Sequence, residues 1–144
     1  MNKEYMCYCG MYCGNCMVKA QVEPASKVLY DVMQKAGFEE NAHMTPDGEK
    51  FWSFMKTMSE DGACKSCQDG SGDPKCSVRV CAQARNVEVC ALCEIYPCDK
   101  LESFFHVYPV LKDDNEFLRT KGMDAWMQMQ DERQENGFVY THEA

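Results

Sequence analysis

The chain has 144 residues, a length that fits one small domain with a modest core. Its 23 Asp and Glu residues outnumber its 15 Lys and Arg residues, which gives a formal net charge of -8. An excess of negative charge repels phosphate backbones, so we expect no nucleic-acid binding through a general basic face. No stretch approaches the roughly 20 apolar residues that a transmembrane helix needs, so we expect no membrane partner.

Cysteine is the unusual component of this sequence, with 11 residues. Such a density is typical of a disulfide scaffold or of a metal-binding domain. The first residues, Met1 to Cys7, lack the basic and apolar regions of a secretory signal, so we expect a cytoplasmic protein. Because the cytosol keeps ordinary thiols reduced, the composition favours metal binding over a cystine framework.

The first half of the chain predicts two helices after an irregular segment. Residues 1–22 are rich in cysteine and have little helical periodicity, as expected of a loop held by metal. A helix is predicted over 24–37, with Gly37 as its terminator. A second helix should open at Thr45-Pro46-Asp47 and end at Asp61-Gly62. It should bury four large side chains, Phe51, Trp52, Met55 and Met58.

The second half predicts four more helices. The first runs over 73–86, with Asp73 as N-cap and Cys76 in the first turn. The second starts at Pro97 with Cys98 beside it, and the others cover 109–119 and 123–136. We therefore expect a mainly α, small single domain, residues 1–144, with irregular Cys-rich loops stapled by metal. Its ligands should lie within 9–98, and its C-terminal part, 99–136, should be helical.

Ten of the cysteines recur at spacings typical of metal ligands. Three pairs have the form C-x2-C, which places two sulfurs of a tight turn on one ion about 2.3 Å away. Two such halves close a tetrahedral zinc site, so ten cysteines predict about two zinc ions. The predicted ligands are Cys9, Cys13, Cys16, Cys64, Cys67, Cys76, Cys81, Cys90, Cys93 and Cys98.

Sequence spacing leaves the pairing of these ligands open. One scheme joins the pair at 64 and 67 to the pair at 90 and 93 across a spacer typical of zinc ribbons. A second scheme keeps 64, 67, 76 and 81 around one ion and leaves 13, 16, 90 and 93 for another. Cys7 enters neither scheme, and we expect it to be an ordinary buried thiol.

A resemblance to a known family lies in four ordered motifs, which are Cys9-Gly-Met-Tyr-Cys13-Gly-Asn-Cys16, Cys64-Lys-Ser-Cys67, Cys76-Ser-Val-Arg-Val-Cys81 and Cys90-Ala-Leu-Cys93-Glu-Ile-Tyr-Pro-Cys98. They are similar to a prokaryotic cysteine-rich family, domain of unknown function 3795. The resemblance implies zinc binding by these ten cysteines and a bacterial or archaeal origin. It implies no reaction, and Cys7 lies outside the pattern.

Two cysteine chemistries compete with zinc. The spacing at 9, 13 and 16 also matches the three-cysteine motif of radical S-adenosylmethionine enzymes, but Asn15 replaces an aromatic residue and the chain is too short for most of a barrel. A simpler iron–sulfur cluster remains an alternative. A thiol-redox role for Cys13-Gly-Asn-Cys16 is another, although no βαβ pattern surrounds it.

Hydrolysis by zinc needs an open coordination position, whereas sites made only of thiolates are usually closed. His43, His106 and His142 form no metal-binding motif, and each is expected at the surface or the core edge. The sequence therefore leans against catalysis. It predicts a zinc-binding module that binds another protein, with an iron–sulfur or thiol-redox protein as the alternative.

Overall fold

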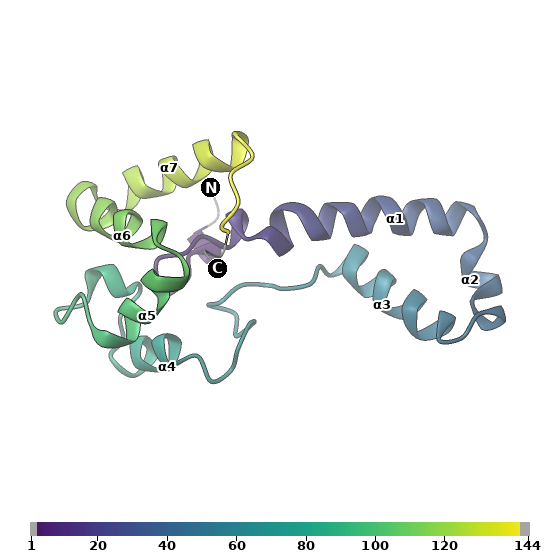
Figure 1. Ribbon diagram of the computed structural model, residues 1–144, viewed down its shortest axis with the longest axis horizontal. Coiled ribbons are helices and arrows are strands. Elements are labelled where there is room, and N and C mark those ends of the chain that lie inside the picture. Colours follow the sequence, from purple (N-terminus) through teal and green to yellow (C-terminus); the bar gives the residue numbers. More distant parts are fainter. Residues whose placement is uncertain (1–2, 142–144) are drawn as a thin grey trace. The chain divides into compact units, whose positions relative to one another are not determined.

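The computed structural model describes residues 3–141, and His142 lies outside them. The expected mainly α fold is confirmed: helices dominate, and no strand occurs within these residues (Figure 1). The chain's contacts separate two compact units. Unit 1 comprises residues 1–16 and 65–144, and unit 2 comprises residues 17–64. The motifs therefore fall in both units, and the two are described separately.

Unit 2 is an antiparallel helical hairpin (Figure 1). The π-helical segment η3 (Val18–Val22) leads into α1 (Glu23–Lys35), followed by α2 (Phe38–Asn41), the 3-10 turn η4 (Ala42–Met44) and α3 (Gly48–Glu60). Gly37 ends α1 as predicted, because its φ of 73° is left-handed. The N–H of Gly37 donates to the carbonyl of Gln34, 3.0 Å away.

The core of unit 2 is aromatic. The rings of Tyr30 in α1 and Trp52 in α3 stack with their centroids 4.7 Å apart, and Met55 is buried beside them. Burial of Trp52, Met55 and Met58 confirms the sequence prediction. Burial of Phe51 was predicted wrongly, since this side chain is 43% exposed. Phe51 directly precedes Trp52, and one residue turns a helix by about 100°, so both cannot face α1.

Unit 1 joins the cysteine loops to four helices. It contains the 3-10 turns η1 (Lys3–Tyr5), η2 (Cys13–Asn15) and η5 (Cys90–Leu92). The helices are α4 (Ser77–Ala84), α5 (Asp99–Val107), α6 (Val110–Lys121) and α7 (Met123–Glu135). The helices expected over 109–119 and 123–136 are thus present. They are separated at Gly122, whose φ is 87°.

The helix expected over 73–86 begins later than predicted, at Ser77. The cause is Arg79, a buried side chain that donates hydrogen bonds to the carbonyls of Ser71 (2.6 Å) and Asp73 (2.5 Å). These bonds hold the preceding residues as a loop. Cys76 is therefore the N-cap of α4 rather than part of its first turn. Cys98 is likewise the N-cap of α5.

Two cores stabilise unit 1. One surrounds Trp126 of α7, which is fully buried against Met6, Tyr12, Val89 and Leu118. The other is built around thiols, with Cys7, Cys9 and Cys13 packed against Val78 and Leu101. Cysteines thus form a large part of one hydrophobic core. Within the described residues, no helix is both long enough and apolar enough to cross a bilayer.

Candidate metal centre

Two of the C-x2-C motifs form the same tight turn. In η2 the N–H of Cys16 donates to the carbonyl of Cys13, and in η5 the N–H of Cys93 donates to that of Cys90, both over 3.0 Å. The closing residues have nearly equal backbone angles, with φ and ψ of -70° and 136° at Cys16 and -72° and 141° at Cys93. Such turns bring two sulfurs within reach of one ion.

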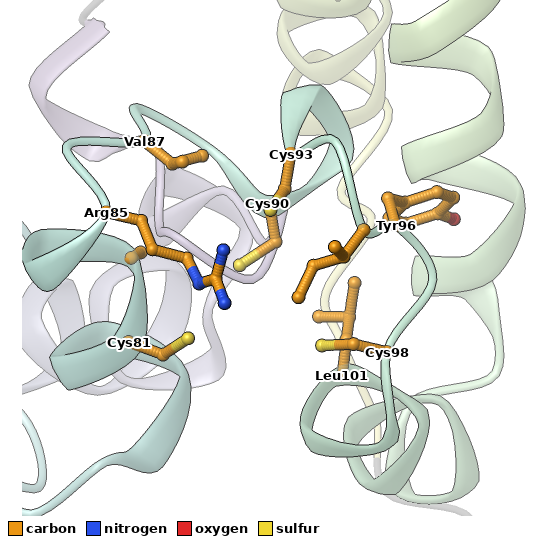
Figure 2. A pocket seen from close by; sticks show the side chains of 10 residues that line it. Cys81, Arg85, Val87, Cys90, Cys93, Tyr96, Cys98 and Leu101 are labelled. Atoms are coloured by element: carbon orange, nitrogen blue, oxygen red, sulfur yellow. The ribbon is translucent and has the colours of Figure 1, made fainter.

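Four thiols line one small cavity in unit 1. Cys81 comes from α4, Cys90 and Cys93 from the η5 turn, and Cys98 from the N-cap of α5. Figure 2 shows the sulfurs of Cys81, Cys90 and Cys98 directed toward a common space. The cavity has a volume of about 20 Å³, which is room for one water-sized occupant. We call these four residues the cavity thiols.

Burial and the neighbouring thiols shape the electrostatics of this cavity. Burial, and after it the nearby Cys9, Cys98, Cys93 and Cys81 thiols, together raise the pKa of Cys90 to about 12. Several thiolates in one place repel one another, so each favours the neutral form until a cation is present. Arg85 also lines the cavity and supplies one positive charge (Figure 2).

A second group of thiols surrounds Cys7. The Sγ atoms of Cys7 and Cys13 lie 3.2 Å apart, Cys9 belongs to the same buried core, and Cys67 packs against that core. These thiols, with Cys13 the strongest influence, raise the pKa of Cys7 well above its usual value. Cys7, and after it the Tyr8 N–H and Arg79, lower the pKa of Cys67 to about 6 against the opposing effect of burial.

Three polar side chains hold the cysteine loops in place. Asn115 of α6 donates to the carbonyl of Cys9 (3.0 Å), and Arg119 of α6 donates to the carbonyl of Ala91 in η5 (2.5 Å). Asn15 of η2 donates to Oε1 of Gln130 in α7 (2.8 Å). The carbonyls of a loop bonded in this way cannot move freely, so α6 and α7 determine where the thiols lie.

The other three predicted ligands do not line the cavity. Cys16 lies near Tyr108, whose pKa is raised by burial and then by the Cys16 and Cys9 thiolates. Cys76 packs at the edge of the thiol-containing core. Cys64 belongs to unit 2, where its N–H donates to Glu23 Oε1 over 3.4 Å. Neither pairing scheme derived from the spacing corresponds to this grouping. Within the described residues, His43 and His106 are exposed.

As the side chains stand, no three His, Cys, Asp or Glu residues within 3–141 are arranged to hold one metal ion. None of the 11 cysteines forms a disulfide. A shared ion would therefore require cysteine side chains to turn inward by rotation about χ1. Thiols are short, and a change between staggered rotamers moves the sulfur without moving the backbone.

Sequence reasoning missed the residues that support the thiols. Arg79 lies between Cys76 and Cys81 and looks like an ordinary helix residue, yet its side chain is 5% exposed. Asn115 and Arg119 lie beyond the last motif, and Asn115 shares the buried face of α6 with Leu111 and Leu118. The spacing of four residues between Asn115 and Arg119 puts both on one face of α6, and this was the one available signal.

The comparison with protein families gives one match. The model of a family described as "Protein of unknown function (DUF3795)" matches residues 5–103. The chain belongs to this family. The match covers both groups of thiols and ends within α5, so α6 and α7 lie outside it. No curated protein and no solved structure matches the chain.

Proposed function

We propose that this protein binds zinc through cysteine thiolates, about two ions per chain, in a reducing cytoplasmic compartment. We further propose that it is not an enzyme but a module that binds protein. The observation that carries zinc binding is that the four cavity thiols line one space of about 20 Å³. Four thiolates at roughly 2.3 Å satisfy the tetrahedral preference of zinc.

The size of the cavity favours a single ion over the iron–sulfur alternative. A space of about 20 Å³ holds one water-sized occupant, whereas an iron–sulfur cluster adds several iron and sulfide atoms. Apolar side chains, including those of Ile95 and Leu101, also line this space. A buried ion that bears four thiolates has no open position for a substrate, which supports a structural role.

Cobalt absorption tests this proposal. Cobalt in a tetrahedral thiolate site absorbs visible light strongly, and zinc displaces it with loss of colour. Reduced, metal-free protein should take up cobalt, and Cys90→Ser should lose the absorption that belongs to the cavity thiols. Cys16→Ser is the matched control, because Cys16 closes an equivalent turn but does not line the cavity. Protein that folds yet takes up no cobalt, or that is purified brown with iron and sulfide, contradicts the proposal.

The exposed face of unit 2 supports the interaction role. Leu29, Val32, Phe51 and Phe54 are 46%, 60%, 43% and 59% exposed. Each directly precedes a residue that packs between α1 and α3, namely Tyr30, Met33, Trp52 and Met55. In an antiparallel helix pair, residues that precede the inward-facing ones lie on the same side of both helices. The four therefore form one apolar face, which we call the hairpin face.

We propose that the partner of the hairpin face is a second copy of the chain. Two hairpins that pair through it make a four-helix bundle, in which each apolar face covers its equivalent. None of the four side chains is charged, so the paired faces bring no like charges together. Val22 and Ala25 extend the stripe along α1 at intervals of three and four residues, as in packed helix pairs.

Sedimentation across a range of protein concentrations tests the proposed self-association. The wild-type chain should dimerise, and Leu29→Gln with Phe54→Gln should be monomeric while it keeps its helical content. Lys27→Gln with Lys56→Gln, on the same two helices, is the matched control and should dimerise. A wild-type chain that stays monomeric at high concentration, or a double variant that still dimerises, refutes the proposed self-association but leaves zinc binding untouched.

A further inference from the structure

The N-terminal loop gathers three thiols within seven residues. Met6 and Tyr12 form an antiparallel bridge, and the N–H of Cys7 donates to the carbonyl of Met11 over 2.8 Å. The loop reverses at Gly10, whose N–H donates to the carbonyl of Cys7 over 3.0 Å. This reversal places Cys7, Cys9 and Cys13 in one core, each at most 8% exposed.

A fourth thiol reaches this loop from a distant part of the sequence. Cys67 lies 60 positions after Cys7, yet it packs against the core that contains Cys7. Four thiols, those of Cys7, Cys9, Cys13 and Cys67, are therefore gathered at one core, where the Sγ atoms of Cys7 and Cys13 lie 3.2 Å apart. Buried thiols behave as small apolar groups and pack against any apolar neighbour, whereas zinc ligation requires four of them at one point. The gathering of four thiols from three separate turns therefore indicates that they bind one common ligand.

A buried cation lies against this group. Arg79, 5% exposed, donates a hydrogen bond to the carbonyl of Cys67 over 3.4 Å, and its charge acts on the Cys67 thiol. Four thiolates around one zinc ion leave a net charge of -2, and a buried charge of that size needs a nearby compensating charge. An arginine also lines the cavity that the cavity thiols share, although this residue, Arg85, is exposed.

We propose that Cys7, Cys9, Cys13 and Cys67 are the ligands of a second zinc ion, with Cys7 as a full ligand. We call these residues the Cys7 thiols. The assignment rests on the proposed function for the identity of the metal, and it adds the ligand set. On binding, zinc takes the place of the thiol protons, which pass to solvent. Cys16, Cys64 and Cys76 then take no part in either site.

Native mass spectrometry of the full chain tests the assignment, because it counts ions on each molecule. The wild type should carry two zinc ions, Cys7→Ser should carry one, and Cys16→Ser, the matched control, should carry two. A double variant, Cys7→Ser with Cys90→Ser, should carry none. A Cys7→Ser chain that keeps as many ions as the wild type overturns the assignment, because a spectator thiol does not change the count.

A second measurement avoids reliance on a variant that could fail to fold. Cys67 and Cys16 are both half-buried, so alkylation of the wild type compares them directly. Zinc should slow alkylation of Cys67 at least tenfold relative to the metal-free chain, and should leave Cys16 unchanged. Equal rates for Cys67 with and without zinc overturn the assignment. If Cys90→Ser nevertheless loses one zinc ion, the proposed zinc binding by the cavity thiols is supported and only the second site is refuted.

A disulfide between Cys7 and Cys13 is the competing account of their 3.2 Å contact. It predicts a chain lighter by two hydrogen atoms, with both cysteines resistant to alkylation until a reductant is added. Zinc ligation predicts the full reduced mass and release by a chelator alone. A chain that keeps this disulfide after purification under reducing conditions contradicts the assignment.

Discussion

The side chain of Asn115 donates a hydrogen bond to the carbonyl of Cys9, across 106 positions of the chain. The same Nδ2 atom also lies 2.7 Å from the carbonyl of Leu111, so Asn115 links the backbone of α6 to the cysteine loop. Gly10 makes this approach possible, because a Cβ at that position would lie 2.4 Å from Asn115 Nδ2. A helix beyond the family match thus positions a loop within it.

Gly10→Ala should lower the free energy of unfolding by about 2 to 4 kcal/mol. The new methyl group would overlap Asn115, and the φ of 87° is unfavourable for alanine. Gly70→Ala is the matched control, since Gly70 has a φ of 84° with nothing within 4 Å of the added atom. It should cost about 1 kcal/mol. Denaturant titration measures both values, and equal losses would contradict the role of Asn115.

Arg119→Ala should weaken zinc binding at the cavity thiols about tenfold. Arg119 donates to the carbonyl of Ala91 inside the Cys90–Cys93 turn and also packs over the Tyr96 ring, with its Cζ 4.7 Å from the ring centroid. Competition with a chelator measures the affinity. Lys121→Ala, an exposed position on α6, is the control. Unchanged affinity in the Arg119 variant would show that the turn is held by other contacts.

Arg79→Met should lower the free energy of unfolding by about 3 kcal/mol, because the carbonyls of Ser71 and Asp73 lose a charged donor. Amide hydrogens of residues 66–73 should also exchange faster. Arg79→Lys keeps the charge but offers one ammonium group instead of a planar fork, so an intermediate loss is expected. If the lysine variant is as stable as the wild type, the positive charge stabilises the loop and simultaneous hydrogen bonding to the two carbonyls does not.

Tyr140 should make stability depend on alkaline pH. Burial, and after it the charge of Asp114, raises the pKa of Tyr140 above its usual value near 10. A folded pKa above the unfolded one stabilises the protein below about pH 10, and this contribution falls as the pH rises further. By about pH 11 the loss should approach 1.4 kcal/mol.

Tyr140→Phe provides the comparison. It should be about 1 to 2 kcal/mol less stable than the wild type near pH 8, because the Tyr12 N–H loses its acceptor at 3.2 Å. Other titrating groups are common to both chains, so the difference between them isolates Tyr140. That difference should shrink between pH 10 and 11. A constant difference across this range would contradict the burial of the phenol.

Helix positions were predictable because local signals determine them. Gly37 and Gly122 end helices through backbone angles that other residues rarely adopt, and apolar spacing revealed the segments between them. Exposure was less predictable. The periodicity of α1 contains two apolar stripes, one through Tyr30 and one through Leu29, and only packing against α3 shows which is buried.

The candidate site was predictable in its residue types but not in its grouping. Spacing identified the Cys90–Cys93 turn, because two residues between cysteines suit one turn. The packing of Cys67 against the core that contains Cys7 depends on how distant loops meet, and no local sequence pattern predicts it. Cys7 was expected to be a spectator because it precedes the motifs; the structure places it among three thiols, and its role as a ligand is a proposal.

Elemental analysis of the folded, reduced wild-type chain tests the central claim most directly. We predict about two zinc atoms per chain and no stoichiometric iron. We also predict that a chelator which removes the zinc abolishes cooperative melting of unit 1, because structural zinc contributes on the order of 10 kcal/mol to small domains. A chain that is folded, fully reduced and free of metal, with the same melting curve before and after chelation, would contradict the account.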